Sequence, residues 1–148
     1  MKIAYQNKLV VEKANERENL QWIFLTLTVR NTDAQELPET LSELSKGFYR
    51  LFKYKRVSSA VKGYFRALEV TRNADKDNPE WYGTYHPHYH VLIAVRPSYF
   101  KKAYIKQADW VALWRKAMRL DYDPIVHVQR VKPKAELDDM TSYEADVK

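Results

Sequence analysis

The sequence predicts an α+β fold: a ferredoxin-like split βαβ arrangement, with an antiparallel sheet that carries its helices on one face and leaves the other face open. Two observations support this fold class. Four segments dense in strand-forming residues and two segments with apolar residues at helical spacing follow in the order β-α-β-β-α-β. The chain also has 148 residues, of which 45% are hydrophobic, so residues 1–148 suit a single domain with its own core.

The first half of the chain contains the first strand, the first helix and the second strand. A strand is expected at residues 22–29 (WIFLTLTV), before a turn-forming cluster at 31–33. A helix should begin at Pro38, because proline suits the first helical position, and should continue to about residue 55. The second strand is expected at 63–72 (GYFRALEVTR), where β-branched and aromatic residues gather again.

The second half begins with a long loop at 73–87, and loops of this length in small domains are often functional. A strand, a helix and a last strand are then expected at 88–95, 107–120 and 125–131. Trp110 and Trp114 share the apolar face of the helix, so both should belong to the core. The tail after residue 131 is polar, and we expect it to be helical from about residue 135.

Side chains alternate between the two faces of a strand, so their parity separates an apolar set from a polar set. The apolar sets, which include Leu25, Leu27, Leu68 and Val70, are expected to face the helices. The opposite face should then collect hydroxyl, carboxylate and imidazole groups, from Thr26, Thr28, Glu69, His88 and His90. One face of the sheet therefore becomes core, and the other becomes the candidate site.

The segment HPHYH places His88 and His90 two residues apart on a strand, so both imidazoles point the same way. With Glu69 on the neighbouring strand, they would offer two nitrogen ligands and one oxygen ligand to one divalent ion. This donor set suits Mn²⁺, Zn²⁺, Co²⁺ or Ni²⁺, and Mg²⁺ can serve through its abundance. From spacing alone, two half-exposed histidines without a metal explain the motif equally well. His86 has the same parity and is open as a ligand, a substrate contact or neither.

Composition narrows the class of partner. Lys and Arg number 25 against 19 Asp and Glu, and a net charge of +6 suits a polyanionic partner. The absence of cysteine excludes disulfides, thiolate zinc sites and a cysteine nucleophile, and it fits a reducing cytoplasm. No apolar run reaches the length of a membrane span, and charges interrupt the segment where a secretory signal would lie. We therefore expect a cytoplasmic protein that binds nucleic acid and no membrane.

Candidate nucleic-acid contacts gather near the histidines. Aromatic side chains of the long loop would stack on unpaired bases, and arginines that follow the strands would meet phosphates. Lysines before the second helix add positive charge. For any single basic residue, an ordinary solvated position on the surface is the better explanation. The candidates are Arg30, Arg72, Trp81, Tyr82, Tyr85, His86, Lys101 and Lys102.

Three segments resemble, in order, the motifs of rolling-circle plasmid replication initiators, which belong to the HUH endonucleases. They are FLTLTVRN at 24–31, ALEVTRN at 67–73 and HPHYHVLIAV at 86–95. SYF at 98–100 and the tryptophan-containing helix after it agree as well. The resemblance therefore covers about residues 22–131, which is most of the chain.

The resemblance implies a function and a set of site residues. His88 and His90 match the paired metal-binding histidines of the family, and Glu69 matches its acidic position on the neighbouring strand. Such proteins nick one strand of a replication origin through a tyrosine that stays joined to the DNA 5′ end, while the released 3′-OH primes synthesis. The implied cofactor is one Mn²⁺ or Mg²⁺ ion. The implied partners are single-stranded or hairpin plasmid origin DNA and a host helicase.

The tyrosine of the family follows the last strand, typically with a glutamate four residues before it. Tyr143 is the only tyrosine in that region, with Asp139 four residues before it, and it is the candidate catalytic residue. The alternative is that the chain is truncated before the tyrosine motif, so that the nucleophile lies beyond Lys148. Three other functions stay open: a transposase or relaxase of the same superfamily, a metal-dependent nuclease that uses activated water, and a non-catalytic nucleic-acid-binding module.

Overall fold

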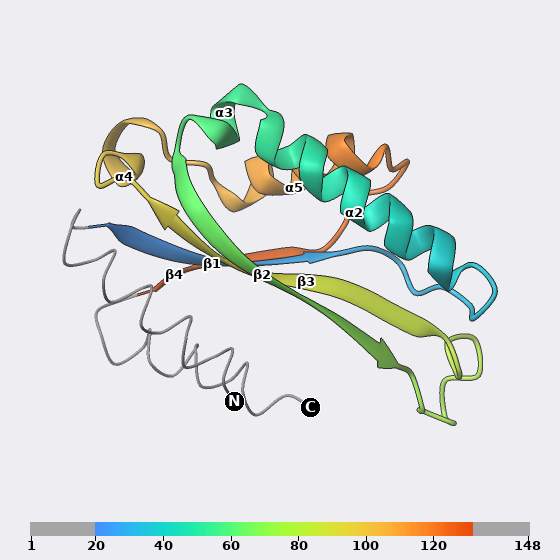
Figure 1. The fold of residues 1–148 in the computed structure, drawn as a ribbon. Coiled ribbons are helices and arrows are strands. Elements are labelled where there is room, and N and C mark those ends of the chain that lie inside the picture. Colours follow the sequence, from blue (N-terminus) through green and yellow to red (C-terminus); the bar gives the residue numbers. More distant parts are fainter. Residues whose placement is uncertain (1–19, 132–148) are drawn as a thin grey trace.

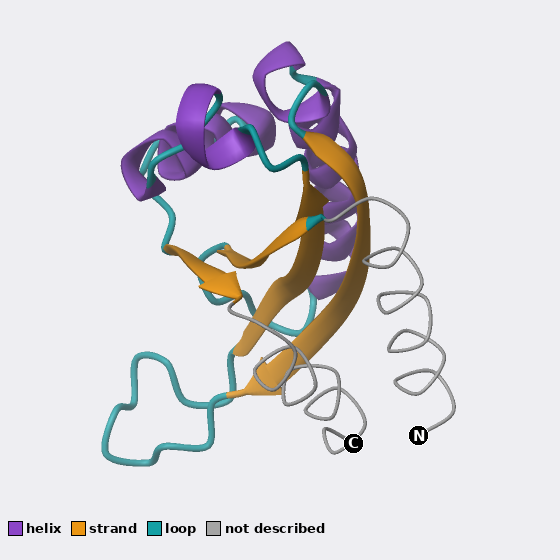
Figure 2. Cartoon of the chain, turned by 90° about the vertical axis from the view of Figure 1, so that its left-hand side faces the viewer, coloured by secondary structure: helices purple, strands orange, loops and turns teal. Residues whose placement is uncertain are grey.

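The structure, a computed structural model, describes residues 20–131. In chain order the elements are β1 (Gln21–Thr28), α2 (Leu37–Lys53), α3 (Lys55–Ser58), β2 (Val61–Arg72), β3 (Tyr85–Val95), α4 (Tyr99–Lys102), α5 (Gln107–Met118) and β4 (Val126–Val131). The four strands form one sheet in the order β2-β3-β1-β4, and all neighbouring strands are antiparallel. Helices α2 and α5 cover the same face of this sheet (Figures 1 and 2), which confirms the predicted fold class.

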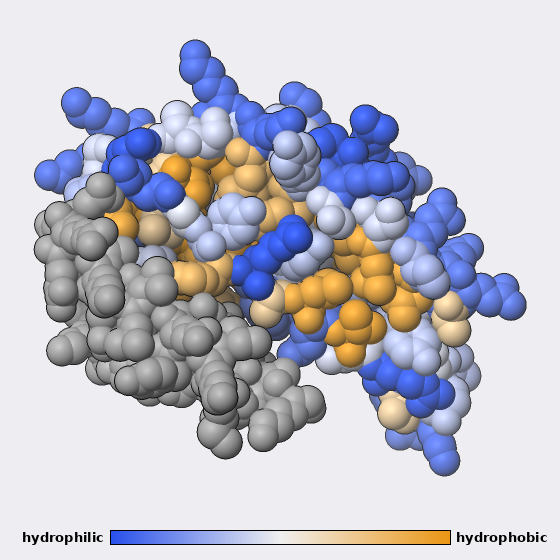
Figure 3. Space-filling model, in the orientation of Figure 1, coloured by the Kyte–Doolittle hydropathy of each residue, from blue (hydrophilic) through white to orange (hydrophobic). Residues whose placement is uncertain are grey.

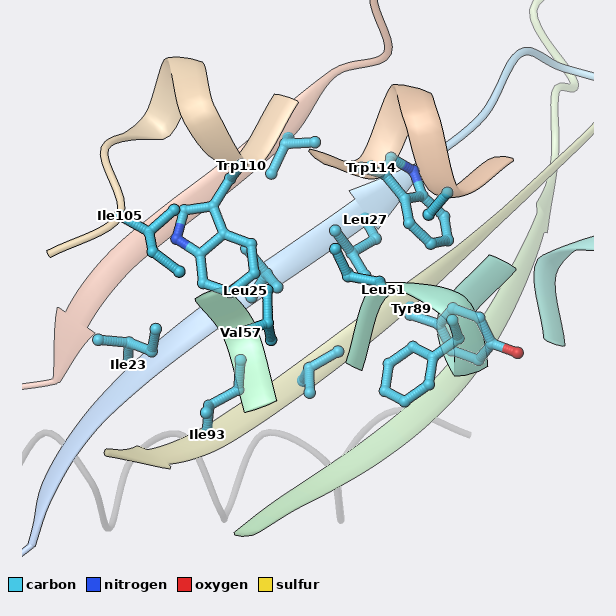
Figure 4. Close-up of a cluster of buried hydrophobic side chains, with 14 of the residues drawn as sticks. Ile23, Leu25, Leu27, Leu51, Val57, Tyr89, Ile93, Ile105, Trp110 and Trp114 are labelled. Carbon is cyan, nitrogen blue, oxygen red and sulfur yellow. The ribbon is translucent and has the colours of Figure 1, made fainter. Parts of the chain in front are cut away.

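The core lies between the sheet and helices α2 and α5. Leu25 and Leu27 of β1 are 0% exposed, and Trp110 and Trp114 of α5 pack over this strand, as predicted (Figure 4). The indole nitrogen of Trp114 donates a hydrogen bond of 2.8 Å to the main-chain oxygen of Thr28. This bond satisfies the buried indole. It also ties α5 to the end of β1 where the polar face carries its hydroxyl groups.

Helix α2 begins as predicted, with Pro38 in its first turn and Glu39 near the positive end of the helix dipole. It ends slightly earlier than expected because Tyr54 is extended, with φ −59° and ψ 132°, and the chain then forms the separate short helix α3. Where α2 crosses α5, a Cβ atom at Gly47 would overlap the side chain of Met118. The two helices therefore approach closely at this glycine.

Strand β2 forms one edge of the sheet, and here the predicted core was wrong. Leu68 and Val70 face the helix side, but their exposed fractions are 46% and 39%. An edge strand has a neighbouring strand on only one side, so its side chains are covered less well than those of β1 and β3. Together with Tyr64, which is 44% exposed, they form an apolar strip on the surface, and Figure 3 shows apolar atoms at the surface over β2.

The face opposite the helices carries the predicted polar groups at one end, and its other end is apolar. Trp22, Leu92, Ala94 and Val131 are buried there as a second apolar cluster, with Phe24 and Phe65 packed against it. The cluster covers the half of the sheet toward the start of β1 and the end of β3. The polar groups are therefore confined to the other half, and the candidate site is smaller than the whole open face.

Candidate metal centre and nucleic-acid interface

Strand pairing brings the predicted metal ligands together. In the sheet register Glu69 of β2 and Thr28 of β1 are both partners of His88 in β3. His90 follows two residues later, so its side chain leaves the sheet on the same face. The register therefore places a carboxylate and two imidazoles, from two neighbouring strands, at one point on the open face.

Distances within this group are short. The Nε2 atom of His88 lies 3.0 Å from Oε1 of Glu69, and the Nε2 atom of His90 lies 3.9 Å from the same oxygen. The rings of His88 and His90 meet edge to face, with centroids 4.8 Å apart. One ligand atom from each residue lies within 4.8 Å of the others. Among residues 20–131, this is the group of His, Cys, Asp and Glu side chains that could hold a metal ion, and we refer to Glu69, His88 and His90, the candidate ligands, as the metal group.

The donor set fits a divalent transition metal. Imidazole nitrogens and a carboxylate oxygen are ligands that such ions accept, and Glu69, His88 and His90 would together hold the ion. The second nitrogen of His88, Nδ1, lies 3.1 Å from the main-chain oxygen of His86. A proton on Nδ1 would be donated to this oxygen, which leaves the lone pair of Nε2 directed toward Glu69. That tautomer is the one a metal ligand requires.

The surroundings favour neutral imidazoles. Burial lowers the pKa of His90, and positive charge on His88 lowers it further, against the opposing effect of Glu69. Burial also lowers the pKa of His86, again with a contribution from His88 and against the main-chain oxygen of Val29. Since only the neutral ring binds a metal ion, both shifts favour the binding form at neutral pH. The His88, His90 and Glu69 side chains are 10%, 16% and 23% exposed, and both ring nitrogens of His90 are buried, so the group lies largely below the surface of the open face.

The loop between β2 and β3 covers residues 73–84, which is shorter than predicted because β3 begins at Tyr85. Tyr85 and His86 therefore belong to the strand that carries the ligands. Trp81 and Tyr82 lie in the loop and are 37% and 43% exposed, and the guanidinium of Arg72 lies 5.5 Å from the Tyr82 ring centroid. These predicted DNA contacts all lie at the end of the sheet that holds the metal group.

The remaining predicted contacts divide between the two ends of the sheet. Arg30 follows β1 and stacks on Tyr122, with its guanidinium carbon 3.8 Å from the ring centroid. Lys101 and Lys102 instead belong to α4, which follows the opposite end of β3. Five residues of extended strand, about 17 Å, separate His90 from Val95 at that end. The structure therefore does not bring this lysine pair to the metal group, and its role in DNA binding stays a prediction.

One histidine of this face was missed. His127 of β4 pairs with Thr26 of β1, which pairs with His90, so the three residues form one row across the open face. The signal was present in the sequence, because Val126 and Val128 mark the buried parity of this strand and His127 has the opposite parity. All four histidines of the chain thus lie on one face.

Tyr143, the candidate nucleophile, lies outside the described residues, as does the helix expected from about residue 135. Both the catalytic role of Tyr143 and the boundaries of the domain stay predictions.

In the part of the chain between residues 20 and 131, none of the helices combines the length and the apolar character that crossing a bilayer requires.

Comparisons with known proteins give a consistent result. A family model described as "Replication protein" matches residues 1–147. A "Protein rep" of a Bacillus species is 56% identical over 138 residues, which cover 93% of this chain and 43% of that relative. A "Protein rep" of Bacillus amyloliquefaciens is 51% identical over 148 residues, which cover 100% of this chain and 42% of the relative.

A more distant relative, a "Replication protein" of Staphylococcus aureus, is 42% identical over 143 residues, which cover 95% of this chain and 56% of the relative. The chain thus spans about half the length, or less, of these relatives. No solved structure matches the chain. Membership of the family therefore rests on similarity of sequence, and the metal group is a separate observation made on this chain alone.

Proposed function

The chain belongs to the replication protein family, and from this membership we propose that it is the domain of a plasmid rolling-circle initiator that nicks single-stranded origin DNA. The observation that carries the proposal is the Glu69–His88–His90 group on the open face of the sheet. A replication protein that only bound DNA would not need two imidazoles and a carboxylate whose ligand atoms lie within 4.8 Å of one another. The resemblance to replication proteins that the sequence indicated is confirmed at the level of the family.

The chemistry follows from the donor set. A bound Mn²⁺ or Mg²⁺ ion would polarise the scissile phosphate and reduce the repulsion that an incoming nucleophile meets. Glu69, His88 and His90 would hold the ion, and Arg30 and Arg72 would orient the flanking phosphates. A tyrosine oxygen would then attack phosphorus and lose its proton, while the bond to the 3′ oxygen breaks and that oxygen gains a proton. The products are a 5′-phosphotyrosine and a free 3′-OH.

We assign the nucleophile to Tyr143, and a tyrosine beyond Lys148 is the alternative. We also propose that residues 1–148 form a single endonuclease domain, whose physiological ion is manganese or magnesium. A host helicase as a partner and a location in the cytoplasm complete the proposal. The helicase rests on the resemblance to rolling-circle initiators, and the location rests on the composition of the sequence.

The proposal is tested by metal binding and by covalent capture of DNA. Mn²⁺ is titrated into the wild-type chain and into His90→Ala, and thermal stability is followed in parallel. At about 100 times its dissociation constant, a bound ion should stabilise the wild type by about 2.7 kcal/mol, and His90→Ala should lose this effect. Single-stranded origin DNA labelled on the 5′ side and on the 3′ side of the nick should give a covalent adduct with the 3′ fragment only, and Tyr143→Phe should abolish it.

His127→Ala is the matched control, because it removes an imidazole from the same face outside the metal group. It should keep the binding of Mn²⁺. Cleavage without an adduct would point to a nuclease that uses activated water. Absence of Mn²⁺ binding in all variants, with DNA binding retained, would reduce the protein to a nucleic-acid-binding module. An adduct formed by His90→Ala at the wild-type rate would contradict the proposed site.

A further inference from the structure

A cavity of about 520 Å³ opens beside the metal group. It is lined by two neighbours of His88: Thr28, its strand partner, and His86, whose ring centroid lies 5.3 Å from that of His88. Its walls come from the end of β1, the β2–β3 loop, the start of β3 and the segment before β4. Small-ligand sites range from about 300 to 1,000 Å³, so the cavity has room for one nucleoside-sized group.

Planar groups, two aromatic rings and one guanidinium, form part of the cavity wall. The guanidinium of Arg30 lies over the ring of Tyr122, with 3.8 Å between its central carbon and the ring centroid. The main-chain N–H of Arg30 also donates a hydrogen bond of 3.0 Å to the hydroxyl of Tyr122, so this ring is held at two points. The indole of Trp81, 37% exposed, lines the same cavity. Aromatic and guanidinium planes are the surfaces on which unpaired bases stack.

Two amide side chains line the cavity and complement these flat surfaces. The Nδ2 atom of Asn31 donates a hydrogen bond of 2.9 Å to the Thr84 hydroxyl, and the Oδ1 atom of Asn73 accepts one of 2.9 Å from the main-chain nitrogen of Asp75. Within residues 20–131, Oδ1 of Asn31 and Nδ2 of Asn73 make no hydrogen bond. One acceptor and one donor are thus available for the edge of a ligand, which is how proteins read a nucleobase.

The loop that carries Trp81 is already held in place. The main-chain nitrogen of Asn73 donates to the oxygen of Thr84 over 2.8 Å, and that of Gly83 donates to the oxygen of Asn73 over 2.7 Å. Gly83 permits this closure because its φ is +78°, which side chains disfavour. Since the loop needs little rearrangement, a ligand would lose little affinity to ordering it.

A second cavity, of about 490 Å³, lies behind the Arg30–Tyr122 pair and shares both residues. It is lined by Glu36, Glu39 and Glu43 of α2 and the residues before it, so it repels a phosphate chain. The first cavity is lined by a single carboxylate, that of Asp123, which is paired with Arg115 over 2.7 Å, so it suits a nucleotide better than the second cavity does.

We propose that the first cavity binds one unpaired nucleobase, that of the nucleotide next to the phosphate at the Glu69–His88–His90 group. Trp81 and the Arg30–Tyr122 pair stack against the base, and Asn31 and Asn73 contact its edge. The proposal rests on the proposed function, because it takes the ligand to be a single DNA strand. It adds the subsite through which the protein distinguishes one nucleotide beside the cleaved bond.

The test separates contacts with bases from contacts with phosphates. Affinity is measured without metal for two strands of equal length and charge: an ordinary single strand of mixed sequence, and a strand made wholly of abasic residues. The wild type should prefer the strand that has bases. Trp81→Ala and Asn73→Ala should lose about 5- to 150-fold in affinity for that strand and should keep their affinity for the abasic strand.

Tyr104→Ala is the matched control, since Tyr104 is 51% exposed but lies outside the cavity, and it should behave as the wild type. A loss for both strands in Trp81→Ala and Asn73→Ala would show phosphate contacts or a folding defect, and no loss for either strand would leave the cavity without a role. Either result overturns the proposal. His90→Ala should retain the preference for bases, so failure of the nicking chemistry and failure of the base subsite are distinguishable.

Discussion

At the scale of single residues, Glu69 supplies the negative charge of the metal group and can act either as a hydrogen-bond acceptor or as a metal ligand. Its carboxylate lies within 4 Å of both imidazoles, and it is the only negative charge of the group. Without an ion it accepts a hydrogen bond from His88, over 3.0 Å, when Nε2 carries the proton. With an ion it would contribute charge that the two neutral rings lack. The two roles are separable by a substitution that keeps the shape of the side chain.

Glu69→Gln keeps an oxygen that accepts a hydrogen bond from His88 but removes the charge. We expect the thermal stability of the metal-free protein to stay close to that of the wild type. The affinity for Mn²⁺ should fall about tenfold or more, because ligand charge sets the affinity of oxygen sites for hard cations. Calorimetric titration with Mn²⁺ checks this, and an unchanged affinity would show that Glu69 is not a ligand.

Much of this group was predictable from the sequence, and the reasons are local. The parity of His88 and His90 follows from two residues of strand, and Glu69 has the parity of the polar set in its own strand. The position of His127 required the pairing of β4 with β1, which joins strands far apart in the chain. The neighbours of Asn31 and Asn73 depend on how loops fold back on one another, which no periodicity encodes.

At the scale of elements, the packing of α2 on α5 depends on one glycine. Because a Cβ at Gly47 would overlap Met118, a large side chain there must displace Met118 or separate the helices. Gly63 offers a contrast, since nothing lies within 4 Å of a Cβ built on it. The sequence does not predict this contact, since helical periodicity does not reveal which residue of another helix lies opposite Gly47.

Gly47→Leu should therefore lower the free energy of unfolding by about 1–3 kcal/mol through overpacking. In the double variant with Met118→Ala, part of this loss should return, with a coupling above about 0.5 kcal/mol. Chemical denaturation of the two single variants and the double variant measures it. Gly63→Leu is the control and should change stability little. Strict additivity of the Gly47 and Met118 effects would mean that the two side chains do not compete for space.

Edge position explains where the predicted elements and the structure differ. Alternation in β2 shows which side chains share a face, but it does not show how well that face is covered. Leu68 and Val70 lie on the helix side but are still exposed, because β2 is an edge strand of the sheet. The apolar cluster at the other end of the open face also depends on how the strands are arranged. Its residues Trp22, Leu92 and Val131 come from three different strands, which only the pairing of those strands brings together.

At the scale of the whole molecule, the net charge of +6 predicts a strong effect of salt on DNA binding. For a single strand, the slope of log affinity against log salt changes by about 0.7 for each phosphate that the protein no longer neutralises. Arg72→Ala, at the metal end of the sheet, should reduce the slope by about this amount even for a short strand. Fluorescence anisotropy at several salt concentrations gives the slope.

Lys101→Ala combined with Lys102→Ala provides the comparison, since α4 lies at the other end of β3. The double lysine variant should match the wild type for a short strand and should reduce the slope only for a strand long enough to span β3. An unchanged slope with the long strand would place α4 outside the path of the DNA. A reduced slope with the short strand would show that the strand binds at the lysine end instead.

The ligand set has a consequence for the order in which the chain folds. Glu69, His88 and His90 belong to the hairpin that β2 and β3 form around the loop at residues 73–84, whereas the pairings of β1 with β3 and with β4 join more distant parts of the chain. Closing a short loop loses less chain entropy than closing a long one, so the hairpin can form first. The three candidate ligands can then meet before the central strand β1 joins the sheet.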